Sequence, residues 1–299
     1  MLSTNKNTGA PKGLKGLLDR LYKTFDAAFL STDPLWAVHG FERDEDREIV
    51  GLIASSLAYG RVEGIKNSIG KCLDVMGKNP YDFTLSLRPQ KDLRRFAGFV
   101  HRFNTGEDIC ALLFIAQKMI KEKGSINGFF LKGFSPEDEN VKNALSVFSD
   151  NALSLYDSSS GVYCAGGRGA LPQKAGVRFF FPNPRDGSAC KRMNLYLRWM
   201  VRRGDSLDFG IWKGISPSKL VMPLDTHIAR IARNIGLTTL SSPGWSMAED
   251  ITRSLKRLDP EDPVKYDFAL CRLGILDKCP KTIDLKKCDG CLIKNICVI

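Results

Sequence analysis

The 299-residue sequence carries 44 basic and 33 acidic residues, which gives a formal net charge of +11 at pH 7, and 43% of its residues are hydrophobic. This content is ordinary for a globular protein, and the length suits one large domain or two modest ones. No apolar run reaches the roughly 18 residues that span a bilayer, and the start lacks the apolar core of a secretory signal. We therefore expect a cytoplasmic protein. Its charge suits nucleic acid or an anionic membrane surface, with an ordinary solvated basic surface as the alternative.

The first half of the chain has the periodicity of amphipathic helices. Apolar residues recur at helical spacing in 14–30, and an acidic stretch at 41–50 runs into 51–60, which is apolar nearly all round. Further helices are predicted over 60–77, 107–124 and 135–156, the last opened by Ser135. No strand-like alternation of useful length occurs, so we predict an all-α fold.

Two residues at the junction of the second and third predicted helices are candidates for contact with DNA. Tyr59 could insert between bases and Arg61 could bind phosphate. The alternative is that Tyr59 packs in the core, as tyrosines at helix ends usually do. The lone His101 is predicted to be an ordinary packed or surface residue.

A long irregular segment at 157–186 interrupts the helical pattern. Five glycines between Gly161 and Gly176 are followed by the apolar patch 177–181 and then by two prolines. Long loops inside compact domains are usually functional or mobile. We expect the Phe-rich end to dock on the core and the loop to act as a lid or as a DNA contact.

The polar turn 186–194 leads into a helix that begins near Lys191. Backbone amides at a helix start can hold phosphate, so Gly187 and Ser188 are candidate DNA contacts. The helix should place Leu195, Trp199 and Met200 inward. It should also present a basic edge that faces either DNA or solvent, made of Lys191, Arg192, Arg198, Arg202 and Arg203, of which Arg192, Arg198 and Arg202 are candidate DNA contacts.

Asp225 is predicted to be the N-cap of the next helix. Ile228, Ile231, Ala232 and Ile235 follow it at helical spacing, and Gly236 is a C-terminal stop. A carboxylate at this position accepts amide N–H bonds and still presents an oxygen to a cleft. A purely structural cap is the ordinary alternative. Two more helices are expected at 246–259 and 262–276.

Five of the nine cysteines lie after residue 270. In a reducing compartment, clustered cysteines are metal ligands or free thiols more often than disulfides. Four of them have the spacing C-x8-C-x2-C-x5-C and are chosen as metal ligands: Cys279, Cys288, Cys291 and Cys297. Spacing alone does not separate a [4Fe–4S] cluster from a zinc site. Cys271 falls within a helical pattern and is expected to be a buried thiol.

Two stretches of the sequence resemble motifs of the helix-hairpin-helix DNA glycosylases of the endonuclease III superfamily. The differences from those motifs suggest a divergent bacterial branch of that superfamily. The stretch from Gly187 to Lys191 resembles the hairpin L-P-G-x-G-x-K-x-A, with its second glycine replaced by Ala189, and L-D-T-H around Asp225 resembles V-D-T-H. The junction at Tyr59 resembles L-S-A-Q-A-T-D without its glutamine. Residues 202–219 are inserted between the two main motifs.

The resemblance implies roles for these residues. Lys191 stands where bifunctional members carry a Schiff-base lysine, and Asp225 stands where the family carries its essential carboxylate. The cysteine tail resembles the family's [4Fe–4S] loop, with a first interval two residues longer, which favours an iron–sulfur cluster over zinc.

The resemblance also implies a fold, which is a two-lobed helical bundle of the glycosylase type with a four-cysteine cluster loop. We expect an N-terminal helix at 1–40 on the cluster side, a helical lobe at 41–186, the hairpin and catalytic region at 187–276, and the cluster loop at 277–299.

We therefore expect a base-excision DNA glycosylase, with or without AP-lyase activity, that acts on a flipped base and works as a monomer off the membrane. The alternative is a non-catalytic binder of DNA or RNA that keeps the fold and the cluster. The degenerate hairpin favours that alternative, and the retention of both Lys191 and Asp225 favours the enzyme.

Overall fold

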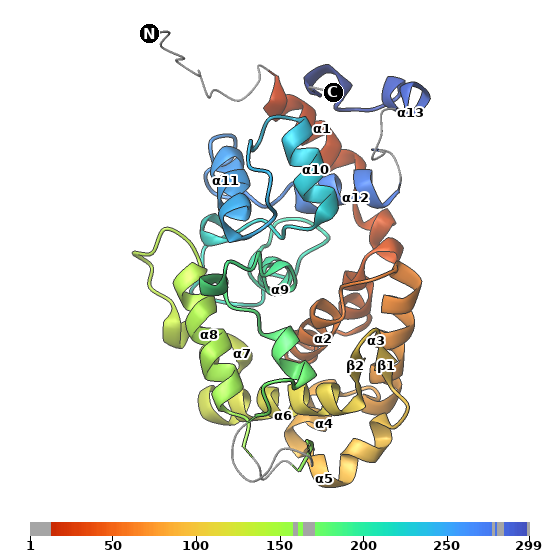
Figure 1. Cartoon of the computed structure of the whole chain (residues 1–299), viewed down its shortest axis with the longest axis vertical. Helices are drawn as coiled ribbons and strands as arrows, with labels where there is room; N and C mark the ends of the chain where they lie inside the picture. The colour runs from red at the N-terminus through yellow and green to blue at the C-terminus, as the bar shows by residue number, and fades with distance from the viewer. Residues whose placement is uncertain (1–12, 158–160, 164–170, 277–278, 280–283, 298–299) are drawn as a thin grey trace.

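The computed structural model describes residues 13–157, 161–163, 171–276, 279 and 284–297, and these residues are mostly helical (Figure 1). Its α-helices are α1 (Leu14–Thr24), α2 (Asp44–Ser56), α3 (Val62–Met76), α4 (Pro80–Ser86), α5 (Pro89–Asp92), α6 (Gly106–Lys123), α7 (Ile126–Phe130), α8 (Lys142–Ser154), α9 (Lys191–Val201), α10 (Thr226–Asn234), α11 (Trp245–Lys256), α12 (Asp267–Ile275) and α13 (Leu285–Asp289). Its 3-10 helices are η1 (Ala27–Thr32), η2 (Pro34–Gly40), η3 (Leu93–Phe96), η4 (Leu131–Gly133), η7 (Gly176–Phe180), η8 (Pro184–Asp186), η9 (Pro217–Lys219) and η10 (Lys294–Ile296). The prediction of a helical fold is confirmed.

A two-stranded hairpin was not predicted. Strand β1 (Val100–His101) pairs antiparallel with β2 (Asn104–Thr105), in the register Val100 to Thr105 and His101 to Asn104. Strands of two residues are too short to show a period of two in the sequence. The hairpin packs between α3 and the start of α6.

Helix α2 runs from the surface into the core, as its sequence predicts. Asp44 and Glu45 are exposed in its first turn, and Ile49 and the apolar residues after it are fully buried. Helix α9 crosses α2 closely at Gly51, where an added Cβ would lie 2.8 Å from Cε of Met200. This glycine lets the two central helices approach each other.

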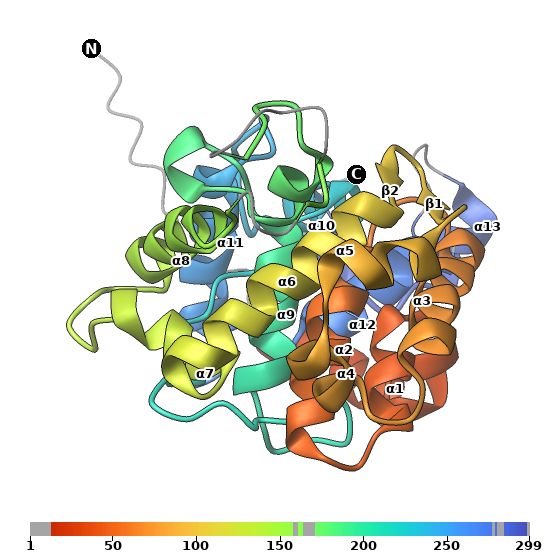
Figure 2. The same cartoon turned by 90° about the horizontal axis from the view of Figure 1, so that it is seen from below.

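The N-terminal helix packs on the C-terminal part of the chain. The Tyr266 hydroxyl donates a hydrogen bond of 2.7 Å to Asp19, and the Tyr22 and Tyr266 rings meet edge to face at 6.4 Å. Helix α1 lies beside α12 (Figure 1 and Figure 2).

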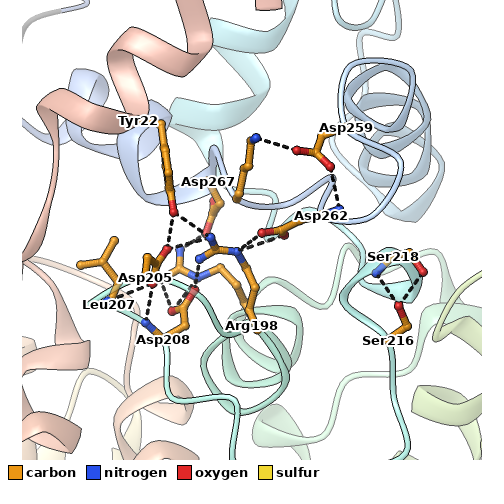
Figure 3. Close-up of polar contacts among 12 residues, drawn as sticks. Tyr22, Arg198, Asp205, Leu207, Asp208, Ser216, Ser218, Asp259, Asp262 and Asp267 are labelled. Atoms are coloured by element: carbon orange, nitrogen blue, oxygen red, sulfur yellow. Dashed lines mark hydrogen bonds and ion pairs between the residues drawn. The ribbon is translucent and has the colours of Figure 1, made fainter.

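A buried network of ion pairs joins α9 to the segment that follows it and to α12 (Figure 3). Arg202 pairs with Asp208 at 2.5 Å, with Asp205 at 2.7 Å and with Asp262 at 2.8 Å. Arg198 pairs with Asp208 at 3.3 Å and also with Asp267. These carboxylates neutralise two guanidinium groups inside the protein, which is the condition for burying them.

Several predicted boundaries are wrong. The helix predicted from 135 begins only at Lys142, because Ser135 accepts from the Glu137 amide at 3.3 Å and caps a local turn instead. The first helix ends at Thr24, and a new cap at Asp26 starts η1. Within the described ranges, no helix combines the length and the apolar character that crossing a membrane would need.

Candidate functional site

A pocket of about 960 Å³ lies where six separate parts of the chain meet. Its wall combines the η1–η2 junction, the α2–α3 junction, the end of the Phe-rich segment, the first turns of α9, the start of α10 and one face of α12. The residues predicted from sequence that line it are Tyr59, Arg61, Ser188, Lys191, Arg192, Arg198 and Asp225. Tertiary structure therefore brings Lys191 and Asp225 into one cavity.

Lys191 is the first residue of α9 and is half-buried in this pocket. Its Nζ donates a hydrogen bond of 3.1 Å to the backbone oxygen of Ala58, just past the C-terminal end of α2. Carbonyl groups at a helix C-terminus favour a positive charge. The amine is thus held against the α2–α3 junction.

Asp225 is the N-cap of α10, as predicted. Its Oδ1 accepts from the amides of His227 and Ile228, both at 2.9 Å, while Oδ2 faces the Cys271 thiol at 3.9 Å. Helix α10 lies close to α12 because residue 274 is glycine, where an added Cβ would come within 2.4 Å of Nδ1 of His227. Only one of the two carboxylate oxygens is therefore used in capping.

Asp267 on α12 belongs to the site, and the sequence analysis missed it. Its side chain is buried, lines the pocket and accepts from Arg198. Burial is the largest effect, and it raises the pKa of the Asp267 carboxyl to about 6. The positive charges of Arg198 and Lys191 act to lower this pKa, and the negative charge of Asp225 acts to raise it. In the sequence, an acidic residue in the first turn of a helix is indistinguishable from one that merely stabilises the helix end. Only the burial of Asp267 in the folded protein separates it from that ordinary case.

Cys271 follows Asp267 by one helical turn and is also in the pocket wall. Burial, reinforced by the nearby charge of Asp225, raises the pKa of its thiol to about 12. The side chain therefore remains a neutral thiol at neutral pH. Cys271 lies in α12 as expected, but its side chain is only partly buried because it faces the pocket.

Aromatic and basic side chains form the mouth of the pocket. The Tyr59 ring packs edge to face on Phe179 at 5.0 Å, and the Arg192 guanidinium lies 3.4 Å from the centre of the Phe179 ring. Arg61 caps the start of α3 and is exposed at the pocket wall. The Phe-rich segment docks on the core as predicted, because Val177, Phe180 and Phe181 are buried. Part of the Gly-rich loop before it lies outside the described residues.

Arg192 is buried rather than on an open basic edge. It donates to the backbone oxygens of Ser56 at 3.4 Å and of Phe179, and burial lowers its pKa to about 10. It still carries its charge at neutral pH. The position of Arg192 beside the Tyr59 and Phe179 rings results from packing between segments that are distant in the sequence, so the local sequence pattern does not predict it.

The prediction that Arg198 and Arg202 form an exposed basic edge is wrong. Both side chains are 2% exposed and are engaged by buried aspartates. The partners Asp205 and Asp208 lie in the inserted segment 202–219, which packs against α9 through these ion pairs. Neither arginine is placed to bind a phosphate at the protein surface, although Arg198 reaches the pocket wall.

The turn before α9 uses part of its hydrogen-bonding capacity internally. The Gly187 amide donates to Pro184 O at 3.0 Å, and the Cys190 amide donates to Ser188 Oγ at 3.2 Å. Gly187 is left-handed with φ of 78°, and Cys190, with φ of 48°, is left-handed without being glycine. The Gly187 amide therefore already has an acceptor inside the turn, and the expected DNA contact at Gly187 and Ser188 stays a prediction.

The four predicted ligand cysteines lie outside the pocket. Burial raises the pKa of the Cys279 thiol, Arg230 lowers it, and the thiols of Cys291 and Cys297 raise it further, so these three lie within electrostatic reach of one another. Across the described parts of the chain, no three His, Cys, Asp or Glu side chains are arranged to hold a metal ion. Thiolate sulfur suits either iron or zinc, and the segment that contains these cysteines includes residues outside the described part of the chain.

A family model matches most of the chain. Residues 33–276 match the family described as "Protein of unknown function (DUF2400)". A search of curated proteins found no match. The matched range includes both motifs around Lys191 and Asp225, so assignment of the chain to the helix-hairpin-helix glycosylase superfamily is wrong. What the pocket does must follow from its own residues.

Proposed function

The chain belongs to the DUF2400 family, and we propose that it binds DNA and removes a base that has rotated out of the double helix into the pocket. The observation that carries this proposal is that the Lys191 amine and the Asp225 carboxylate line one pocket of about 960 Å³. A cavity of that size can accept a nucleoside. An enzyme that acts on a base must take the base out of the stack, which requires such a cavity.

Lys191 is the proposed nucleophile. A neutral amine at Nζ would attack C1′ of the sugar, and the N-glycosidic bond would break with its electron pair leaving on the base. The leaving base would take up a proton, and the covalent sugar–lysine adduct could then open to a Schiff base. An ammonium ion cannot attack, so its proton must first pass to a carboxylate or to water.

Asp225 is the proposed electrostatic partner. Its Oδ2 is not used for capping, so a negative charge can face the cationic sugar that develops as the glycosidic bond breaks. Asp267 adds a second carboxyl to the wall of the same pocket, with a pKa raised by burial to about 6. The two carboxyls are the candidates for moving the proton of Lys191.

DNA as the partner is supported by the charge and by the mouth of the pocket. The chain carries a net charge of +11, and Arg61 is exposed beside the aromatic rings of Tyr59 and Phe179. Basic side chains bind phosphates without regard to sequence, and aromatic rings stack on exposed bases.

We propose in addition that Cys279, Cys288, Cys291 and Cys297 bind a [4Fe–4S] cluster, with zinc as the alternative. The support is the presence of four thiols in one short segment, three of them within electrostatic reach of one another. A bound metal would staple the C-terminal segment to the helices beside it. No step proposed for the pocket passes through it.

A second candidate is a nucleic-acid-binding protein without catalysis. It is favoured by the hydrogen bond from Lys191 Nζ to Ala58 O, which gives the amine a structural partner. Incubation of the protein with lesion-bearing duplexes and borohydride separates the two candidates. A covalent protein–DNA adduct is expected if the protein is a lyase. Binding to the duplexes with neither an adduct nor base release on any of them would support the non-catalytic binding protein instead.

A further inference from the structure

The hairpin β1–β2 presents the most exposed large hydrophobic side chains among the described residues. Phe103 at its tip is 59% exposed, and Val100 is 58% exposed. Exposed apolar side chains that form a patch rimmed by polar residues often mark binding sites. The tip therefore requires an explanation in terms of what it contacts.

Phe103 is continuous with the mouth of the pocket. Its ring lies 4.6 Å from that of Phe179, edge to face, and 5.6 Å from that of Tyr59. Phe179 and Tyr59 both line the pocket. The three rings contact one another and form a single cluster, which extends from the exposed tip to the wall of the cavity where Lys191 and Asp225 lie.

The tip is held by buried polar contacts. The ring of His101 is bonded to Ser68 Oγ at 2.9 Å and to Tyr59 O at 3.0 Å. Nδ2 of Asn104 donates to Asp108 at 2.9 Å and to Gly176 O at 3.1 Å. A stacking residue must be rigid to act as a wedge, and these contacts fix both strands of the hairpin.

The turn itself is strained. Arg102 has φ of 59°, a conformation that favours glycine, and its side chain lies over Gly60 at the α2–α3 junction. Strained residues persist where the surrounding fold over-determines them, and they cluster at functional sites. An arginine at this position adds an exposed cation directly beside Phe103.

Charge decides which partner suits this surface. Arg102 and Arg61 are exposed on either side of Gly60, and the Arg192 guanidinium lies beneath the Phe179 ring. Exposed cations interleaved with aromatic rings suit a polyanion with flat bases, whereas an apolar protein partner would have to desolvate the arginines.

We infer that Phe103 stacks on a DNA base next to the nucleotide that enters the pocket and fills the gap that this nucleotide leaves. This inference rests on the proposed function, because it assigns to the hairpin the opening of the base stack. Apolar side chains that insert at a base step hold the duplex open in this way. Arg102 would bind the adjacent phosphate.

The inference can be tested by binding alone, without catalysis. The probe is a duplex with a tetrahydrofuran abasic-site analogue opposite 2-aminopurine, whose emission changes when it is unstacked. Affinity is measured by anisotropy at several salt concentrations for the wild type, Phe103→Ala and Phe103→Trp. Leu240→Ala is the matched control, since Leu240 is 40% exposed and does not line the pocket.

Phe103→Ala should bind roughly 5- to 100-fold more weakly, the effect of losing one base–aromatic stack, and should lose the change in 2-aminopurine emission. The dependence of log K on log salt should be unchanged, because no phosphate contact is lost. Phe103→Trp should restore both signals, and Leu240→Ala should match the wild type. Thermal unfolding of each variant checks that the fold survives.

Three results would overturn the inference, and they differ in what they mean for the proposed function. If Phe103→Ala binds and perturbs the probe like the wild type, the stacking role is wrong while the proposed function stands. If the wild type binds neither this duplex nor any lesion-bearing duplex, the proposed function fails and the stacking role fails with it. If Phe103→Ala instead abolishes self-association and leaves DNA binding intact, the patch is a contact between copies of the chain.

Discussion

Sγ of Cys271 lies 3.9 Å from Oδ2 of Asp225, so the carboxylate is shared between a thiol on α12 and the amides that begin α10. Its Oδ1 accepts both amide hydrogen bonds of the cap. The two oxygens therefore have separable roles, one in holding the helix and one in facing the pocket.

Asp225→Asn should separate these roles. The amide oxygen of asparagine still accepts from the His227 and Ile228 amides, so the free energy of unfolding should fall by no more than about 1 kcal/mol. Base removal should fall by orders of magnitude, because the charge that faces the sugar cation is lost. Urea unfolding and a base-release assay measure the two effects. Full activity in this variant would leave Asp225 with only its capping role.

Lys191→Gln should abolish borohydride trapping and change DNA affinity by only a few fold, since one charge inside the pocket is removed. Lys213→Gln is the matched control: its Nζ bonds Gly210 O at 3.3 Å, and it does not line the pocket. Trapping should persist in that control. Trapping that survives in Lys191→Gln would place the nucleophile elsewhere.

Arg202→Met should destabilise the protein by about 3–5 kcal/mol, because it removes the cation of the Asp205 and Asp262 carboxylates and leaves Asp208 paired with Arg198 alone. Arg203→Met, one residue along and exposed, should change stability by no more than about 0.5 kcal/mol. Denaturant unfolding of both variants measures the difference. Unchanged stability in Arg202→Met would contradict the buried network.

Lowering the pH should reduce the contribution of Asp205 to the stability of the folded protein. Burial raises the pKa of this carboxyl, but the Arg202 guanidinium and the Tyr22 hydroxyl lower it to about 2, below the value of about 3.9 in an unfolded chain. A lowered pKa in the folded state stabilises the protein above about pH 4, and the gain is lost as the pH falls toward 2. Because Asp205 is partly open to solvent, we expect about 1–2 kcal/mol.

The comparison with Asp205→Asn isolates this contribution, since asparagine can keep the hydrogen bonds from the Leu207 and Asp208 amides. The difference in unfolding free energy between wild type and variant should be largest above pH 5 and should shrink by pH 2. A difference that is constant over this range would show that Arg202 does not hold the ionised form.

The purified protein should be brown, with a broad absorbance at roughly 400 nm, if the cysteine segment binds an iron–sulfur cluster. Cys288→Ser or Cys291→Ser should remove the colour and the iron, whereas Cys271→Ser, in the pocket wall, should keep both. Metal analysis gives the answer directly. A colourless protein that contains one zinc ion would favour the zinc site. The absence of metal from a fresh preparation would contradict both the iron–sulfur and the zinc proposals.

Local patterns were sufficient for much of the helical fold. The periodicity at α2, α3, α6 and α9 and the cap at Asp225 depend on residues within a few positions of each other, so one dimension contains the information. Lys191 and Asp225 line the same pocket, as expected if the two residues act together. The family resemblance that suggested this joint role was wrong.

The sequence by itself determined a basic helical protein, the start of α9 at Lys191 and the cap of α10 at Asp225, because hydrophobic period and capping are local. Only the tertiary structure decided which charges face solvent. Arg198 and Arg202 have the spacing of an exposed edge, but their fate depends on carboxylates that lie up to 69 residues away along the chain. Asp267 and Phe103 acquire their positions in the same way, through contacts between distant segments. A charge can be buried only where opposite charges converge, and that convergence exists only in the folded chain.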